Sequence, residues 1–258
     1  MLPVGIQLYS VRDFMEKDFY GSIKKIADIG YKGVEFAGFY DNKPKEIRKF
    51  IDDLGLVCHS SHDPFPNKQN INEIIDNISM LGGNFSISGV GPDDVSTEEK
   101  AKATIDKFAE AVNLFEGSEI NFAVHNHWWE FFYKVDGMIF FDALIKTVPN
   151  ICSELDIFWT TLGGADPVKV IEKYPKNITL LHSKDGNSKL PWNHEVDPVI
   201  MLANGDGNIN IKGCIEAAKK SIVSWNIVEL DFTDGDMWKA VARSYEYLTK
   251  NELCTGRI

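Results

Sequence analysis

The chain has 258 residues, of which 44% are hydrophobic and 25% are charged, so it can bury a sizeable core without disulfide staples. Its formal charge is −11, and we see no long run of Lys or Arg, which argues against a nucleic-acid partner. No apolar stretch approaches the ~20 residues of a membrane span, and no signal peptide is evident. We therefore expect a cytoplasmic protein with no membrane partner. The four cysteines form no CxxC pair, which predicts neither a disulfide framework nor a zinc–thiolate site.

Short apolar runs alternate with amphipathic segments along the whole chain. The apolar runs predict strands that begin near residues 4, 33, 56, 85, 120, 152, 178 and 225. Helical periodicity predicts helices over residues 22–30, 45–55, 72–83, 97–115, 168–174, 211–222 and 237–248. This alternation predicts an α/β protein, a (β/α)8 TIM barrel that forms a single domain over residues 1–258. A doubly wound open sheet is less favoured, because no phosphate-binding GxGxxG follows the first strand.

Four apolar runs in the second half of the chain end in residues that can hold a divalent metal. The runs are INFAVHNHWWEF (120–131), CSELDIFW (152–159), ITLLHSKD (178–185) and WNIVELDF (225–232). If they form neighbouring parallel strands of a closed barrel, the side chains at their ends converge. The four candidate ligands are His125, Asp156, His182 and Glu229. Two imidazoles and two carboxylates suit Mn²⁺, Zn²⁺ or Co²⁺ and suit Ca²⁺ poorly.

The alternation of side chains along a strand supports this arrangement, because residues two apart point to the same side. If His182 points into the barrel, Lys184 does too, and if Asp156 points inward, Glu154 lies one layer deeper. His125 and His127 are expected to share a side of the fifth strand. The residues that would then face the helices are all aliphatic: Val124, Leu155, Leu181 and Val228.

Each candidate also has a structural interpretation. A carboxylate at a strand end often caps the next helix, and Lys184 could pair with Glu229 in a structural bridge. Trp128 fits rim packing as well as a sugar-stacking surface, and at most one of His59 and His62 is expected to face the site. The residues that we predict to contact a substrate are Glu35, His62, His127, Trp128, Trp159 and Asp185. The long connection from about residue 185 to 210 would fold over the catalytic face.

Six motifs, in order, resemble those of the xylose isomerase-like TIM barrels, the superfamily of sugar phosphate isomerases/epimerases and of the AP endonuclease family 2 fold. They are GIQLYSVRD, HNHWWEF, LDIFWTTLGGADPVKVI, LLHSKD, GDGNIN and IVELD. The resemblance implies a metal held by Glu, Asp, His and Glu from strands five to eight. Asp156, His182 and Glu229 match the last three of these ligands. His125 stands in place of the first Glu, and Glu130 lies where the family often has an acid that contacts substrate.

The resemblance leads to three hypotheses. The first is a metal-dependent isomerase or epimerase of a sugar or related polyol, which reacts through an enediolate. Glu229, with His125 or Glu130, would move the proton, and Lys184 would stabilise the oxyanion. The second is a lyase or dehydratase on a keto-sugar, for which one effective base suffices. The third is a metal-free sugar-binding barrel. The expected partner is a small carbohydrate, and a homo-oligomer is possible. The endonuclease branch fits badly, because it needs many histidines and a basic DNA groove.

Overall fold

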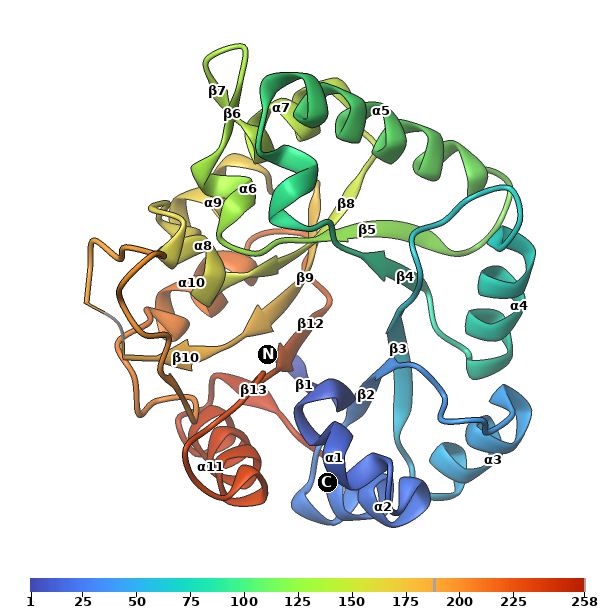
Figure 1. Ribbon diagram of the computed structural model, residues 1–258. Helices are drawn as coiled ribbons and strands as arrows, with labels where there is room; N and C mark the ends of the chain where they lie inside the picture. Colours follow the sequence, from blue (N-terminus) through green and yellow to red (C-terminus); the bar gives the residue numbers. More distant parts are fainter. Residues whose placement is uncertain (188, 258) are drawn as a thin grey trace.

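Eight parallel strands close into a barrel in a computed structural model that describes residues 1–187 and 189–257 (Figure 1). Neighbours in the sequence pair in the sheet, and the last strand, β12, pairs with the first, β1, which closes the barrel. The predicted (β/α)8 fold is therefore confirmed. The strands are Leu2–Gln7 (β1), Gly33–Ala37 (β2), Val57–His62 (β3), Phe85–Ser88 (β4), Asn121–His125 (β5), Cys152–Asp156 (β8), Ile178–Ser183 (β9) and Trp225–Val228 (β12). Residue 258 of the predicted domain and residue 188 of the predicted 185–210 connection lie outside the described residues.

Helices surround the barrel and cover the outer face of its strands (Figure 1). The longer ones are Phe19–Ile29 (α2), Pro44–Asp53 (α3), Ile71–Leu81 (α4), Glu98–Leu114 (α5), Phe140–Thr147 (α7), Pro167–Lys173 (α9), Ile211–Ala218 (α10) and Met237–Lys250 (α11). The short ones are Leu8–Val11 (η1), Arg12–Met15 (α1), Pro92–Val95 (η2), Trp129–Phe132 (α6) and Ile157–Leu162 (α8). Three minor pairings involve Lys134–Val135 (β6) with Met138–Ile139 (β7), Asp185–Gly186 (β10) with Met201–Leu202 (β11), and Cys254–Thr255 (β13) with β1. None of the described helices is long and apolar enough to cross a membrane.

All seven predicted helices are present with small differences at their ends. Helix α2 begins at Asp18, whose carboxylate accepts a hydrogen bond from Gly21 N at 2.9 Å, and ends at Gly30, where φ is +115°. Only glycine adopts this left-handed conformation at low cost, which is why the helix stops there. The sequence did not predict α7 or the short helices. One expectation was wrong: β5 ends at His125, so His127 lies in the loop that follows and not on the strand.

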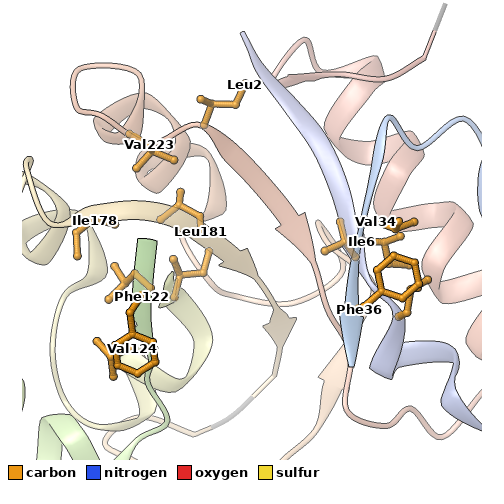
Figure 2. Close-up of a cluster of buried hydrophobic side chains, with 14 of the residues drawn as sticks. Leu2, Ile6, Val34, Phe36, Phe122, Val124, Ile178, Leu181 and Val223 are labelled. Atoms are coloured by element: carbon orange, nitrogen blue, oxygen red, sulfur yellow. The ribbon is translucent and has the colours of Figure 1, made fainter. Parts of the chain in front are cut away.

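The hydrophobic core lies mainly between the strands and the helices. Val124, Leu155, Leu181 and Val228 are fully buried in this layer, which confirms the predicted alternation of side chains. Figure 2 shows part of it. A separate, smaller cluster of Ile87, Ala123, Leu180 and Ile227 packs inside the barrel. Because Ala123, Leu180 and Ile227 lie two residues before His125, His182 and Glu229, the apolar cluster forms the floor on which these polar side chains stand.

Candidate functional site

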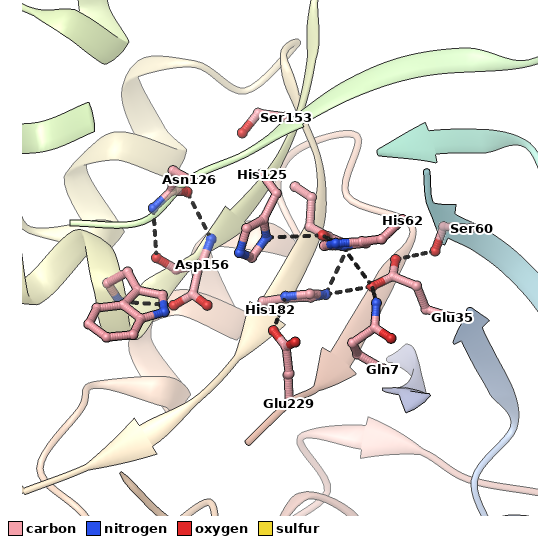
Figure 3. Close-up of polar contacts among 12 residues, drawn as sticks. Gln7, Glu35, Ser60, His62, His125, Asn126, Ser153, Asp156, His182 and Glu229 are labelled. Carbon is pink, nitrogen blue, oxygen red and sulfur yellow. Dashed lines mark hydrogen bonds and ion pairs between the residues drawn. The ribbon is translucent and has the colours of Figure 1, made fainter. Parts of the chain in front are cut away.

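Four side chains meet at the C-terminal ends of four neighbouring strands. His125 ends β5, Asp156 ends β8, His182 lies on β9, and Glu229 follows β12 (Figure 3). Each is at most 5% exposed. Each offers one ligand atom, and these atoms lie within 4.8 Å of one another. The structure thus brings together the four predicted residues, which we call the upper set.

His182 is held from both sides by carboxylates. Its Nε2 lies 2.7 Å from Glu35 Oε1, and its Nδ1 lies 2.8 Å from Glu229 Oε2. With a proton on Nε2 donated to Glu35, a neutral His182 would offer the lone pair of Nδ1 to an ion beside Glu229. Burial alone would lower the pKa of His182, but the charges of Glu154, Glu229 and Glu35 outweigh burial and raise this pKa well above its usual value.

Asp156 is fixed by the start of the next helix. Its Oδ1 accepts a hydrogen bond from Trp159 N at 2.9 Å, so it is the N-cap of α8. Asn126 accepts from the backbone N–H of Asp156 at 3.0 Å and donates to its carbonyl at 3.3 Å. Burial raises the pKa of Asp156 to about 6, although the charge of Lys184 opposes this. The second carboxylate oxygen, Oδ2, remains directed into the site.

Lys184 points into the barrel, as predicted, and lies among three carboxylates. Its Nζ is 2.8 Å from Glu229 Oε2 and 3.1 Å from both Asp156 Oδ2 and Asp231 Oδ2. Burial lowers the pKa of Lys184, but these carboxylates outweigh it and raise this pKa well above the usual value. In turn, Lys184 and His182 overcome burial and lower the pKa of Glu229, which is therefore ionised at neutral pH. The ion pair between Lys184 and Glu229 is the structural bridge that the sequence allowed as an alternative to a catalytic role.

The unused atoms of the upper set fit a metal ion. Asp156 Oδ2, His182 Nδ1 and Glu229 Oε2 are buried, and none has a hydrogen bond of acceptable geometry, although Lys184 Nζ lies near both oxygens. Buried polar atoms without a hydrogen bond are rare. Here each atom has a charged neighbour instead: His182 Nδ1 lies 2.8 Å from Glu229 Oε2, and Lys184 lies beside both oxygens. A divalent ion held by two carboxylates and by imidazole nitrogen satisfies all three atoms.

Glu130 and His127 form the wall of the site after β5. Glu130 accepts a hydrogen bond from His127 N at 2.8 Å through Oε2, whereas its Oε1 is buried without a partner. Burial raises the pKa of Glu130 to about 8, so its carboxyl group is largely protonated at neutral pH. The His127 ring stacks on Trp129, with 4.1 Å between ring centroids, and burial lowers the pKa of His127 to about 3. At neutral pH the His127 ring is therefore neutral and the Glu130 carboxyl group is largely protonated.

The other predicted substrate contacts divide into two groups. Trp159 has a buried indole Nε1 without a partner, and Lys184 Nζ lies 5.7 Å from the centroid of its ring. His62 retains 25% of its side-chain exposure beside the site. Trp128 is at the rim, where its ring stacks on His194 at 4.3 Å. These three side chains border the upper set or the loop above it.

Glu35 and Asp185 have protein partners in place of the expected substrate. Glu35 is fully buried beneath His182, and its Oε1 accepts a hydrogen bond from Gln7 Nε2 at 2.7 Å. Both oxygens of Asp185 accept hydrogen bonds from backbone N–H groups, which belong to Gly186, Gly205, Gly207 and Ile209. Glu35 orients His182, a candidate metal ligand, and Asp185 anchors the loop that contains the GDG sequence.

Sequence reasoning missed several members of this network. Gln7 and Ser60 both hydrogen-bond Glu35, and Asn126 holds Asp156. Glu154 was expected one layer below Asp156, but not as the partner of three histidines. The sequence did contain a sign of these residues. Gln7 and Glu154 are polar residues within apolar runs, at strand positions that face the barrel interior.

Comparisons with known proteins agree with the fold. The profile of the family described as "Xylose isomerase-like TIM barrel" matches residues 23–248. The structure of a sugar phosphate isomerase/epimerase from Parabacteroides distasonis is 25% identical, with 99% of this chain and 100% of that chain covered and a TM-score of 0.78. The structure of a probable 3-DHS dehydratase from Bacillus anthracis is 13% identical, with 96% of this chain and 99% of that chain covered and a TM-score of 0.75. The IOLI protein "with a binding zinc atom" is 14% identical, with 98% of both chains covered and a TM-score of 0.71. A comparison with curated proteins gives no match.

Proposed function

Because the chain belongs to the family of xylose isomerase-like TIM barrels, we propose that it is a divalent-metal-dependent isomerase or epimerase of a sugar or related polyol. The observation that carries the proposal is the convergence of Asp156 Oδ2, His182 Nδ1 and Glu229 Oε2, three buried atoms without a hydrogen bond. The likeness to the sugar phosphate isomerase/epimerase from Parabacteroides distasonis supports the same reaction class.

The upper set would hold Mn²⁺, Zn²⁺ or Co²⁺ through His125, Asp156, His182 and Glu229. When bound, such an ion polarises the carbonyl and adjacent hydroxyl of the substrate, so that a neighbouring carbon loses its proton more readily. The zinc atom bound by the IOLI protein, which has the same fold, supports a metal in this barrel.

The residues of the chain would move the proton. Glu229 is ionised and accepts the proton from the substrate carbon. Lys184, 2.8 Å from Glu229, provides the positive charge beside the oxygen on which negative charge develops. Glu130 is the donor that returns a proton, since its carboxyl group is largely protonated at neutral pH. Trp159 would donate its free indole N–H to a sugar hydroxyl.

A lyase or dehydratase on a keto-sugar is the second candidate. The observation that favours it is His125, a neutral imidazole at the position where the resemblance implies a glutamate. Burial lowers the pKa of His125, so this position does not provide a second ionised carboxylate base. Elimination needs only one effective base, and Glu229 provides it.

A panel of free and phosphorylated ketoses and keto-sugars, assayed with added Mn²⁺, tests both candidates. Uptake of deuterium from solvent without loss of water from the substrate supports isomerisation, whereas loss of water supports elimination. We expect Glu229→Gln to lower kcat by about 100-fold or more, because it removes the base. Glu73→Gln, an exposed residue of α4, is the control. Full activity of Glu229→Gln refutes the mechanism. Failure of the purified protein to take up any divalent ion refutes the metal-dependent enzyme and favours a sugar-binding barrel.

A further inference from the structure

A second group of side chains lies beneath the upper set and also converges. His62, His125, Glu154 and His182 each offer one ligand atom, and these atoms lie within 4.8 Å of one another. We call these four residues the lower set. They come from β3, β5, β8 and β9, and Figure 3 shows the three imidazole rings turned toward one another. The upper and lower sets share His125 and His182.

One carboxylate is the centre of the lower set. Glu154 Oε2 lies 2.8 Å from His62 Nε2 and 3.1 Å from His125 Nδ1. Glu154 Oε1 lies 3.1 Å from His182 Nε2, but it is buried and has no hydrogen bond of acceptable geometry. Ligand atoms at the corners of a tetrahedron around Zn²⁺ are about 3.3 Å apart, given metal–ligand bonds of about 2.0–2.1 Å. The distances from Glu154 to the three imidazoles, 2.8–3.1 Å, are close to this spacing, and all four ligand atoms lie within 4.8 Å of one another.

The charges of this region also favour a cation. Glu35 and Glu154 are both fully buried. In the described part of the chain, their ion pairs are with imidazoles alone, since Lys184 pairs with Asp156, Glu229 and Asp231. Carboxylates removed from water are costly unless a positive charge compensates them. A divalent cation in the lower set provides this charge without requiring any imidazole to be charged.

The two sets differ in the type of ligand. The lower set has three imidazoles and one carboxylate, whereas the upper set has two of each. Imidazole suits Zn²⁺, Cu²⁺ and Ni²⁺, and a larger share of carboxylate suits Mn²⁺ and Mg²⁺. His182 faces the lower set with Nε2 and the upper set with Nδ1. A neutral imidazole has one lone pair for a metal, because its other nitrogen carries a proton.

We propose that the lower set is a second cation site, selective for imidazole-preferring ions such as Zn²⁺, which competes with the upper set so that one ion binds at a time. The inference extends the proposed metal site but does not depend on which reaction the protein catalyses. As a consequence, the two ions bind at different sites. Zn²⁺ binds to the lower set and makes His182 unavailable to the upper set, whereas Mn²⁺ binds to the upper set.

The test is the equilibrium binding of Zn²⁺ alone and of Mn²⁺ alone to chelator-treated protein, measured by calorimetry and elemental analysis. Glu154→Gln removes the carboxylate of the lower set, and Asp156→Asn removes one from the upper set. We expect Glu154→Gln to weaken Zn²⁺ binding at least tenfold and to change Mn²⁺ binding less than threefold. Asp156→Asn should do the reverse. His194→Gln, an exposed imidazole outside both sets, is the control. His62→Gln repeats the test at a partly exposed position if Glu154→Gln fails to fold.

The outcomes are distinct. Unchanged Zn²⁺ affinity in both Glu154→Gln and His62→Gln overturns the proposal, and so does a stoichiometry of two Zn²⁺ per wild-type chain. An equal loss of Zn²⁺ and Mn²⁺ in Asp156→Asn also overturns it, because both ions then use the upper set. Protein that binds Zn²⁺ through Glu154 but takes up no Mn²⁺ supports the lower site, although it counts against the proposed enzyme.

Discussion

Replacement of Asp185 by Asn distinguishes a loop anchor from a substrate contact. The carboxylate accepts hydrogen bonds from Gly186 N and Ile209 N at 2.8 and 3.1 Å through Oδ1, and from Gly205 N and Gly207 N at 2.8 and 3.2 Å through Oδ2. In Asn, one oxygen becomes an NH₂ group, which faces two of these N–H donors. Two hydrogen bonds to a charged acceptor are lost, each worth about 1.5–3 kcal/mol.

The net effect is smaller than the sum of these bonds, because burial raises the pKa of Asp185 even though the four N–H groups lower it. We therefore expect the free energy of unfolding to fall by about 3 kcal/mol, which lowers Tm by roughly 6–12 °C in a chain of this size. Thermal and urea denaturation provide the measurement. Asp206→Asn is the matched control in the same loop. The side chain of Asp206 is 34% exposed and that of its ion-pair partner Arg243 is 60% exposed, so this pair is worth less than about 1 kcal/mol. Equal stability of the two variants, with a raised KM in Asp185→Asn, refutes the structural role.

Three further predictions concern the site and its floor. The stability of Glu130→Gln relative to wild type should increase as pH rises from 5 to 9. The pKa of Glu130 is raised to about 8 in the folded protein, so wild type loses stability as this group ionises, by on the order of 3 kcal/mol. Urea denaturation measures this difference, and a difference that does not depend on pH contradicts the prediction. Trp159→Phe should raise KM about tenfold, because the unpartnered indole N–H is lost. The smaller ring also loses packing, so Tm should fall as well. An unchanged KM removes Trp159 from the substrate contacts. Gly5→Ala should lower the free energy of unfolding by about 1–3 kcal/mol, because its Cβ would lie 2.5 Å from His59 Nε2; a neutral effect shows that His59 moves freely.

The sequence predicted the barrel and the members of the upper set for one physical reason. Alternation along a strand separates two faces, and a polar residue on the inner face at a strand end stands out against apolar neighbours. His182 after Leu181, or Asp156 between Leu155 and Ile157, is such a position. Resemblance to a known family added the expected set of metal ligands and the departure from it at His125. The residues at which strands end were harder to predict. A loop follows β5 after His125, and Asp156 at the end of β8 is already the N-cap of α8.

The relative depth of side chains on different strands could not be predicted. Depth depends on the stagger between neighbouring strands, which arises from backbone pairing and leaves no mark in one sequence. His125 pairs with Glu154, and Asp156 pairs with His182, with a register shift between Ser153 and Glu154. This stagger lowers Glu154 to the level of three imidazoles. A separate register shift, between Val34 and Glu35 in β2, accompanies the position of Glu35 against His182, where a substrate contact was predicted.

His125 belongs to both the upper and the lower set, and the sequence resemblance implies a glutamate in its place. A glutamate at this position would add a third carboxylate to the upper set and would repel Glu154, which lies 3.1 Å from His125 Nδ1. An imidazole instead accepts Glu154 as a neighbour and removes one negative charge from the ligands around the proposed ion. Fewer carboxylates weaken the preference for Mn²⁺ over Zn²⁺. On the proposed assignment, an imidazole at this position therefore shifts the preferred ion toward Zn²⁺ and favours the lower set, while Asp156, His182 and Glu229 keep their places.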